Sequence, residues 1–168
     1  MESATAKPVR PKTLKRWLKS TSNRSFVLYP VLVFLFEFLL HRTPFHWWGW
    51  NLLFGVPLLI WGYGQYRLAG NYRTRIGGGG PGMDNPPTRI VDEGIYAYTR
   101  NPMYLGHMIF YVGLAITFSS WAALLLLAFH IFWFNQRAIE DEESLKQIFG
   151  PAYDAYRQRV KRWIPYVV

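Results

Sequence analysis

The apolar run at residues 103–134 constrains the fold of this chain more than any other feature of its sequence. A single helix of 32 residues would be about 48 Å long at 1.5 Å per residue. That length exceeds the hydrocarbon core of a bilayer, which is about 30 Å thick. Two more apolar runs occupy residues 25–40 and 47–64. We therefore predict an integral membrane protein whose longest run folds back as two helices joined at Ser119-Ser120.

The distribution of positive charge predicts how many helices cross the membrane. Eighteen of the nineteen Lys and Arg residues precede residue 25, lie in 67–100 or lie in 137–162, and Arg42 is the exception. Four spans place those eighteen on one side, as the positive-inside rule requires, whereas an unbroken third span would translocate the last group. We expect an all-α bundle of four transmembrane helices with both the N- and C-termini in the cytosol.

The segments between the apolar runs divide the chain into three parts. Residues 1–24 form a basic arm, which we expect to contact anionic membrane lipid and not nucleic acid, because it directly precedes a span. Residues 25–135 form the transmembrane region. Its cytosolic loop at 67–100 has a centre rich in Gly and Pro, which is either a flexible linker or a lid over a site. Residues 136–168 form cytosolic amphipathic helices that pack back on the bundle.

The C-terminal part is predicted to contain two helices. Gly150-Pro151 is typical of a position where one helix ends and another begins. Apolar residues on both sides of this pair follow the 3.6-residue helical period and predict one buried face: Leu145, Ile148, Phe149, Ala152, Tyr156 and Val160.

Four consecutive acids at 140–143 are sorted by the same helical period. Counting back from Leu145 places Asp141 and Glu142 on the buried face and the outer two acids toward solvent. One interpretation pairs Glu142 with Lys146 one turn away. The other assigns Asp141 and Glu142 to a hydroxyl-rich or cationic ligand, because a carboxylate on an apolar face needs a partner there.

The stretch RNPMYLGH, residues 100–107, opens the longest apolar run with polar side chains. Asn101 suits the N-cap of a helix and Pro102 its first position, which leaves backbone amides free to bind a carboxylate or phosphate. Those amides belong to Met103, Tyr104 and Leu105. An interfacial Tyr and Arg anchor explains the outer residues of the stretch, but it does not explain His107, which lies a turn deeper.

The residue inventory excludes several kinds of site. The chain has no Cys, which excludes a disulfide, an iron–sulfur cluster and a thiol nucleophile. Its four His lack the spacing of a metal site, so we expect no metal.

Two segments within residues 67–165 resemble a known family. The pieces PPTRIVDEGIYAYTRNPMYLG and DEESLKQIFGPAYDAYRQRVKRWIP are similar to the two signature segments of the isoprenylcysteine carboxyl methyltransferase and phospholipid methyltransferase superfamily. That superfamily is membrane-embedded and dependent on S-adenosylmethionine. The resemblance therefore implies this cofactor, transfer of its methyl group, and a lipophilic small molecule or lipid as the acceptor.

The resemblance also implies which residues form the site. Its motifs and the helix start assign the cofactor to Arg100, Asn101, Pro102, Met103, Tyr104, Leu105, Gly106, Asp141 and Glu142. A carboxylate acceptor needs no base, whereas an amine or thiol must lose a proton, and His107 and Glu142 are the candidates to assist it. Asn101 stands where the family commonly has His, so the acceptor stays open, as does the oligomeric state.

Two other functions remain open at the level of sequence. A membrane reductase of related fold binds NADPH in a similar C-terminal pocket, and a non-catalytic lipid-binding scaffold keeps the fold without the chemistry. Equilibrium binding of S-adenosylmethionine against NADPH separates the three.

Overall fold

A computed structural model describes residues 14–41, 49–80 and 85–163, and all of their regular structure is helical. The elements are α1 (Leu14–Lys19), α2 (Thr21–Asn23), the π-helical η1 (Arg24–Leu28), α3 (Tyr29–His41), α4 (Trp50–Arg75), the 3-10 turn η2 (Gly94–Ala97), α5 (Pro102–Phe118), α6 (Trp121–Phe149) and α7 (Pro151–Arg159). The all-α prediction is therefore confirmed for the described residues. The predicted basic arm falls mainly on residues 1–13, which lie outside them.

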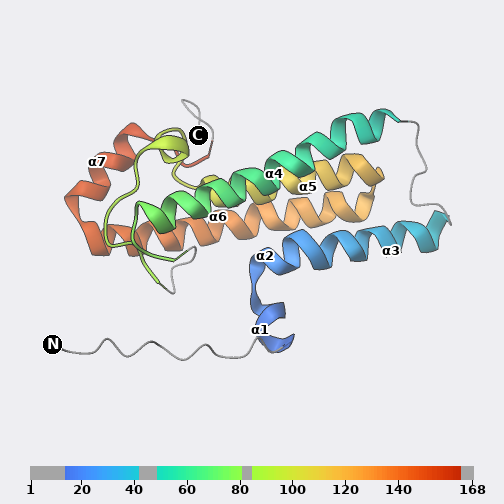
Figure 1. Ribbon diagram of the computed structural model, residues 1–168, viewed down its shortest axis with the longest axis horizontal. Helices are drawn as coiled ribbons and strands as arrows, with labels where there is room; N and C mark the ends of the chain where they lie inside the picture. Colours follow the sequence, from blue (N-terminus) through green and yellow to red (C-terminus); the bar gives the residue numbers. More distant parts are fainter. Residues whose placement is uncertain (1–13, 42–48, 81–84, 164–168) are drawn as a thin grey trace.

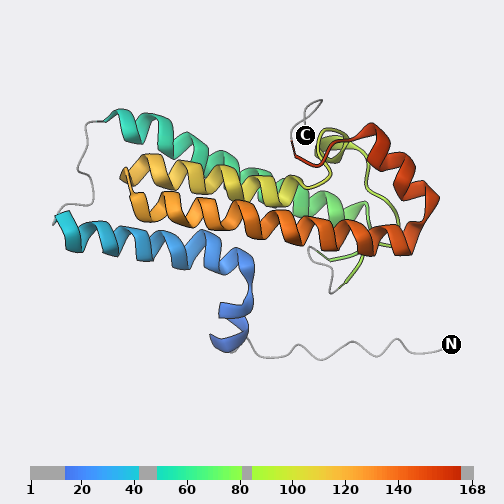
Figure 2. The same ribbon diagram turned by 180° about the vertical axis from the view of Figure 1, so that it is seen from behind.

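The long helices α4, α5 and α6 run alongside one another, and α3 extends in the same direction (Figures 1 and 2). Among the described helices, α4 and α5 share the most extensive contact. Helix α7, η2 and the chain segments around them gather at one end of this bundle, opposite the turn that joins α5 to α6 (Figure 1). Sequence positions far apart therefore meet at that end.

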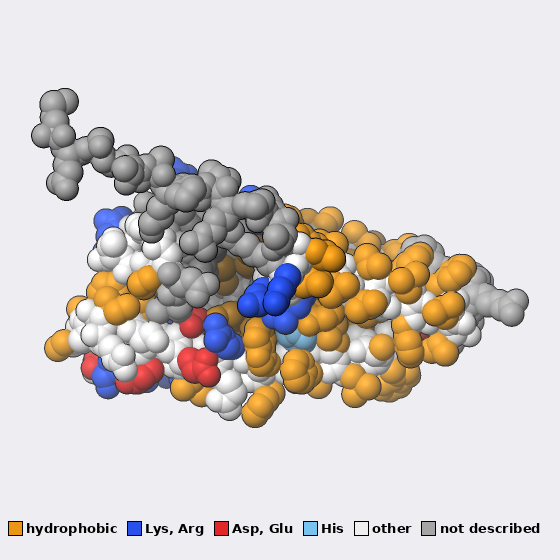
Figure 3. All heavy atoms as spheres, turned by 90° about the horizontal axis from the view of Figure 1, so that it is seen from below, with side chains coloured by type: hydrophobic (Ala, Val, Ile, Leu, Met, Phe, Trp, Pro, Cys, Tyr) orange, Lys and Arg blue, Asp and Glu red, His pale blue; other side chains and the backbone are white. Residues whose placement is uncertain are grey.

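Two described helices are long and apolar enough to cross a membrane: the continuous helix Thr21–Leu40, which joins α2, η1 and most of α3, and α6. Helix α5 is apolar but shorter, with 17 residues. Hydrophobic side chains cover one end of the molecule, while the acidic ones gather mainly over the other (Figure 3). This segregation suits a membrane protein, and the number of four spans stays a prediction.

The predicted break at Ser119-Ser120 is confirmed. Helix α5 ends at Phe118 and α6 begins at Trp121. Between them Ser119 takes a left-handed backbone conformation, with φ of 46°, which reverses the chain. The Ser120 hydroxyl accepts a hydrogen bond from the Ala123 amide at 3.2 Å and so caps α6.

Glycines allow α4 and α5 to approach until their backbones touch. A Cβ atom added to Gly62 would lie 2.5 Å from the Phe110 nitrogen and 2.6 Å from the Gly106 oxygen. One added to Gly113 would lie 2.7 Å from the Leu59 nitrogen. Close approach through small residues is how helices associate where lipid removes the hydrophobic driving force. These contacts fix how α5, and hence its first turn, sits on α4.

Aromatic rings attach the first long helix to the bundle. Phe26 stacks on His107 with ring centroids 4.5 Å apart and meets Phe110 edge-on at 4.8 Å. The Tyr111 hydroxyl donates to the Ser25 hydroxyl at 2.7 Å. Both Phe26 and Ser25 belong to η1, so this helix is held near its N-terminal end.

The predicted cytosolic loop is shorter than expected and, where described, ordered. Helix α4 continues to Arg75, because Ala69 is fully buried against Val91 and Tyr96 of the following segment. The Thr88 amide then donates to the Gly77 oxygen at 2.7 Å. The described part of the loop is therefore folded against α4, while residues 81–84, in the Gly- and Pro-rich centre predicted as a linker or a lid, lie outside the described residues.

The Gly150-Pro151 break between the two C-terminal helices is confirmed, but the predicted buried face is wrong in part. Ile148 and Ala152 are exposed, whereas Tyr153 is buried. The reason is the turn at Gly150, whose φ of 54° changes the chain direction between α6 and α7. One helical period therefore does not run through both helices.

Candidate functional site

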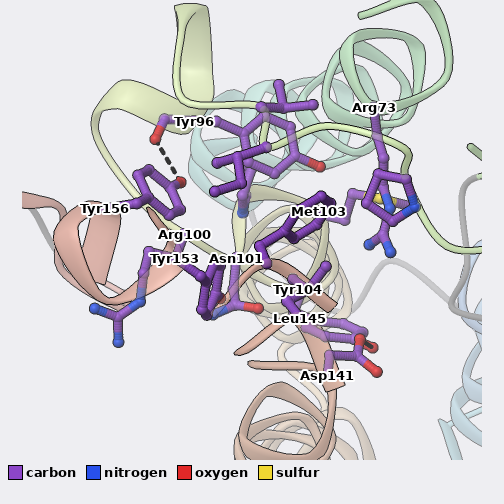
Figure 4. Close-up of a pocket in the computed structure, with 15 residues that line it drawn as sticks. Arg73, Tyr96, Arg100, Asn101, Met103, Tyr104, Asp141, Leu145, Tyr153 and Tyr156 are labelled. Carbon is purple, nitrogen blue, oxygen red and sulfur yellow. Dashed lines mark hydrogen bonds between the residues drawn. The ribbon is translucent and has the colours of Figure 1, made fainter. Parts of the chain in front are cut away.

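A cavity with about 670 Å³ of empty space, the open solvent at its mouth included, lies where the loop, α5, α6 and α7 meet. Six of the residues expected from the sequence line it: Arg100, Asn101, Pro102, Met103, Tyr104 and Asp141. Figure 4 shows Met103, Tyr104 and Asp141 close together, while the Arg100 guanidinium points away from them.

Four expected site residues, Leu105, Gly106, His107 and Glu142, are absent from the described lining. The Leu105 amide donates to the Asn101 oxygen at 3.0 Å, so it is not free for an anion. Gly106 lies against the backbone of Gly62. His107 is 3% exposed and stacks between Phe26 and Phe134, behind the layer of side chains that faces the cavity.

Asn101 occupies the N-cap position of α5 and Pro102 its first position, as predicted. The Asn101 side chain does not cap the helix, however. Its Nδ2 donates instead to Oε1 of Glu142 at 2.9 Å. The charge of a buried carboxylate explains this choice, because a hydrogen bond to an ionised acceptor is stronger than one within the helix turn.

Asp141 lies on the polar part of α6, beyond the apolar stretch that ends at Phe134, and faces the cavity. Its Oδ2 accepts a hydrogen bond from the Tyr104 hydroxyl at 2.6 Å. Burial raises the pKa of Asp141, against the lowering effect of Tyr104 and of the nearby charges of Arg73 and Arg137. The pair therefore offers a ligand both a hydroxyl and a carboxylate oxygen.

Glu142, the neighbouring acid, is 3% exposed and binds arginine side chains in place of the predicted Lys146. Arg100 contacts it with two nitrogens at 3.1 and 3.3 Å, and Arg162 does so at 3.0 and 3.1 Å. Burial raises the pKa of Glu142, but the hydrogen bonds from Arg162 and the charge of Arg100 outweigh it and hold the pKa below its usual range. The pairing of Glu142 with Lys146 is therefore wrong.

Residues 157–163, which we call the C-terminal clasp, cross the start of α5. The Arg100 amide donates to the Lys161 oxygen at 3.0 Å, and the Thr99 hydroxyl donates to the Arg162 oxygen at 2.8 Å. Nη1 of Arg100 also donates to the Val160 oxygen at 2.7 Å. The clasp thus fixes the segment that leads into α5.

Buried tyrosines form the opposite wall of the cavity (Figure 4). Tyr153 and Tyr156 of α7 are 2% and 4% exposed, and the Tyr156 hydroxyl donates to the Tyr96 oxygen at 2.8 Å. Burial raises the pKa of Tyr96 to about 12 and that of Tyr153 and Tyr156 further, so all three stay neutral. These residues were missed from the sequence, although the spacing of Tyr153 and Tyr156 belongs to the second signature segment.

The cavity therefore presents neutral aromatic faces, a carboxylate with a partner hydroxyl, and the side chain of Arg73, while Arg100 lines it with its guanidinium bound to Glu142 and to the Val160 oxygen. Aromatic faces attract cations, arginine binds carboxylates, and a carboxylate accepts hydrogen bonds from ligand hydroxyls. Such a set suits a polar, partly aromatic molecule that carries charges of both signs.

Comparison with known proteins adds a family match. The model of the phospholipid methyltransferase family matches residues 50–152. Protein-S-isoprenylcysteine O-methyltransferase of Schizosaccharomyces pombe is 35% identical over 80 residues, 46% of this chain and 34% of that protein. Protein-S-isoprenylcysteine O-methyltransferase B of Arabidopsis thaliana is 34% identical over 80 residues, covering 47% and 41%.

A relative of a different kind matches a longer part of the chain. Methanethiol S-methyltransferase 1 of Bradyrhizobium diazoefficiens is 29% identical over 126 residues, which is 70% of this chain and 39% of that protein. The chain thus spans about a third to two fifths of the length of these curated relatives. The family match covers most of the cavity lining, from Arg73 to Phe149.

Proposed function

This chain belongs to the phospholipid methyltransferase family, and we propose on that basis that it is a membrane methyltransferase that uses S-adenosylmethionine and a lipophilic acceptor. The observation that carries the proposal is the cavity at the polar end of the bundle. It combines the Asp141 and Tyr104 pair with Arg100 and a wall of neutral tyrosines. Charges of both signs and aromatic faces are what a zwitterionic sulfonium nucleoside requires.

The residues of the cavity fit this cofactor group by group. The Asp141 carboxylate accepts from ribose hydroxyls or the amino group, and the positive charge of Arg73 on the lining offsets a carboxylate. The Tyr104 ring, stacked on Phe134 at 5.1 Å, and the buried tyrosines supply faces for adenine and for the cation. When bound, S-adenosylmethionine supplies a methyl group activated by its sulfonium.

Transfer of a methyl group is an in-line displacement, so the protein contributes chiefly alignment and exclusion of water. The folded loop at residues 85–93 and helix α7 together shield the cavity, because Pro87, Val91 and Tyr153 all contribute to its lining. Neither His107 nor Glu142 contributes to that lining. The proposal therefore assigns neither of them a contact with the acceptor.

The acceptor is proposed to enter from the bilayer and the cofactor from the cytosol. This follows from a four-span arrangement with cytosolic termini, in which the cavity lies at the cytosolic end of the bundle. The two kinds of relative suggest two acceptor classes, a carboxylate on a prenylated cysteine and a small thiol. Water solvates both acceptor classes poorly, so both partition toward the membrane.

Binding and transfer assays on the detergent-solubilised protein test the proposal. We expect calorimetric titration to show binding of S-adenosylmethionine and S-adenosylhomocysteine and none of NADPH. Label from methyl-tritiated S-adenosylmethionine should then pass to a farnesylcysteine analogue or to an alkyl thiol. Binding of NADPH would favour the reductase. Binding of none of the three compounds would favour a scaffold.

A further inference from the structure

The buried carboxylate of Glu142 has no capacity left for a ligand. Its Oε1 accepts from Arg100, Asn101 and Arg162, and its Oε2 accepts from Arg100 and Arg162 again. An ionised carboxylate offers about four lone-pair sites, and five N–H groups already occupy this one. Glu142 therefore differs in kind from Asp141, which accepts the Tyr104 hydroxyl and lines the cavity.

The groups that Glu142 holds are themselves part of the cavity. Arg100 and Asn101 both contribute to its lining, and both direct side-chain nitrogens at Glu142. The Arg100 side chain is 9% exposed, so water does not substitute for these contacts. Without the carboxylate, Asn101 loses the acceptor of its Nδ2, and Arg100 keeps only the contacts of its Nη1 with the Arg157 and Val160 oxygens.

Glu142 also links the cavity wall to the C-terminal clasp. Arg162 reaches it with two nitrogens, and Arg157 approaches it at 3.9 Å. The clasp lies outside the family match, which ends at residue 152. One carboxylate on α6 thus joins the start of α5 to a segment of chain that the family match does not include.

We propose that Glu142 is a positioning residue, which sets Arg100 and Asn101 in the cofactor cavity and makes the C-terminal clasp part of the site. The identity of the cavity's ligand rests on the proposed function. The two acids, Asp141 and Glu142, therefore have different roles. Asp141 meets the cofactor directly, while Glu142 acts through the residues around it.

A double-mutant cycle tests the link between Glu142 and Arg162. Glu142→Gln and Arg162→Gln should each weaken binding of S-adenosylhomocysteine by about tenfold, because each leaves buried groups unpaired. The double variant should lose less than the product of the two, since Arg162→Gln removes a charge that Glu142→Gln leaves uncompensated. Multiplicative losses, or wild-type affinity in either single variant, would overturn the proposal.

Two further variants separate the Glu142 contact from a general effect of removing a charge. Glu143→Gln changes an exposed acid on the same helix and should keep wild-type affinity. Arg162→Lys keeps the charge but cannot make the two-nitrogen contact, so it should fold and still bind less tightly than wild type. Wild-type affinity in Arg162→Lys would contradict the assigned geometry.

Steady-state kinetics distinguish positioning from chemistry and from simple stability. A positioning role predicts that Glu142→Gln raises KM for S-adenosylmethionine while kcat at saturation stays within about twofold. A role as base predicts a fall in kcat at unchanged KM. A purely structural role predicts a lower unfolding temperature with unchanged KM in the folded fraction, and either of these last two results rejects the proposal.

Failure of the proposed function would be recognised separately. In that case the wild-type protein binds neither S-adenosylmethionine nor S-adenosylhomocysteine. The double-mutant cycle is then measured by thermal unfolding without ligand. If Glu142 and Arg162 are in contact, the shifts in unfolding temperature of Glu142→Gln and Arg162→Gln should again not add up in the double variant. Additive unfolding shifts would reject the clasp whatever the ligand is.

Discussion

Helices α4 and α5 meet through glycine backbones, whereas the C-terminal clasp meets the start of α5 through charges and carbonyl oxygens. At the first contact, a Cβ on Gly106 would lie 2.8 Å from the Gly62 oxygen. At the second, Glu142 and Arg162 approach to 3.0 Å through a flexible side chain on each side. The glycine contact leaves no room for an added atom. The contact at the clasp depends on all the side chains that hydrogen-bond to Glu142.

The difference follows from the surroundings of each contact. In the predicted four-span arrangement α4 and α5 lie in lipid, which is as apolar as a leucine side chain, so they gain little from burying apolar surface and depend on close packing. At the polar end, each hydrogen bond replaces bonds that the same groups make to water in the unfolded chain, so one bond contributes only about 1 kcal/mol. Several bonds must therefore converge, as they do on Glu142. A substitution that adds atoms at the glycine contact should therefore lower the stability of the fold. A substitution that removes a polar partner of Glu142 should instead weaken ligand binding.

The largest expected effect is on the fold, from Gly62→Val. The new side chain would have to displace the α5 backbone near Phe110, because the first added carbon already lies 2.5 Å from the Phe110 nitrogen. We expect a loss of about 3 kcal/mol or more. Yield of monodisperse protein in mild detergent and its thermal unfolding measure the loss.

Gly64→Ala is the matched control for the glycine contact. A Cβ at Gly64 meets nothing within 4 Å, and alanine is favoured over glycine inside a helix by about 1 kcal/mol. The control should therefore fold as well as wild type or better. Equal damage from both variants would mean that α4 and α5 do not touch at Gly62.

The next effect is on the site, from Arg100→Lys. Lysine keeps the charge but loses the planar fork that reaches both Glu142 oxygens and the Val160 oxygen. We expect affinity for S-adenosylhomocysteine to fall by about 2 kcal/mol, or roughly 30-fold, while the helical content by circular dichroism stays unchanged. A large loss of helix would show that the clasp supports the fold and not only the site.

The contrast between the two contacts also explains what the sequence can predict. Arg100 and Asn101 were found from the helix start and the first family motif, and Asp141 from the helical period that places it on the Leu145 face; all three line the cavity. Gly62 carried no such signal, since glycine occurs in membrane helices for many reasons. Gly106 was assigned to the cofactor through the family resemblance, whereas the structure places it against Gly62.

The partners of Glu142 were beyond sequence reasoning for a different reason. The clasp leaves the helix at Val160, whose φ of −114° is extended, so helical spacing does not say which arginine turns inward. Arg162 does so, whereas Arg159 pairs with Asp92 at 2.7 Å. His107 was considered as a base because an interfacial anchor does not explain a His one turn deeper than Tyr104, and instead it stacks on rings.

A smaller effect is expected from Tyr104→Phe, which removes one hydroxyl and keeps the ring. Asp141 then loses the hydrogen bond that it accepts at 2.6 Å. We expect cofactor affinity to fall by about 1 kcal/mol, or roughly fivefold, with no change in unfolding temperature. Tyr98→Phe, at an exposed tyrosine, is the control and should bind as wild type does. Equal affinities in all three proteins would remove Tyr104 and Asp141 from the proposed site.

The smallest effect is a separation of the acidic pair by pH. Asp141 has a raised pKa, so it protonates first as the pH falls from 7, and cofactor affinity should weaken above the usual carboxyl range near pH 4. Glu142 has a lowered pKa, so the stability that it contributes is present above its unfolded pKa and is lost only as the pH falls through its lower folded pKa.

The glycine contact has no group that titrates. Calorimetry and unfolding across pH 7 to 3 should therefore show binding lost first, the clasp loosened next, and the helical bundle kept longest. Simultaneous loss of binding and helix at one pH would mean that the two contacts are not independent.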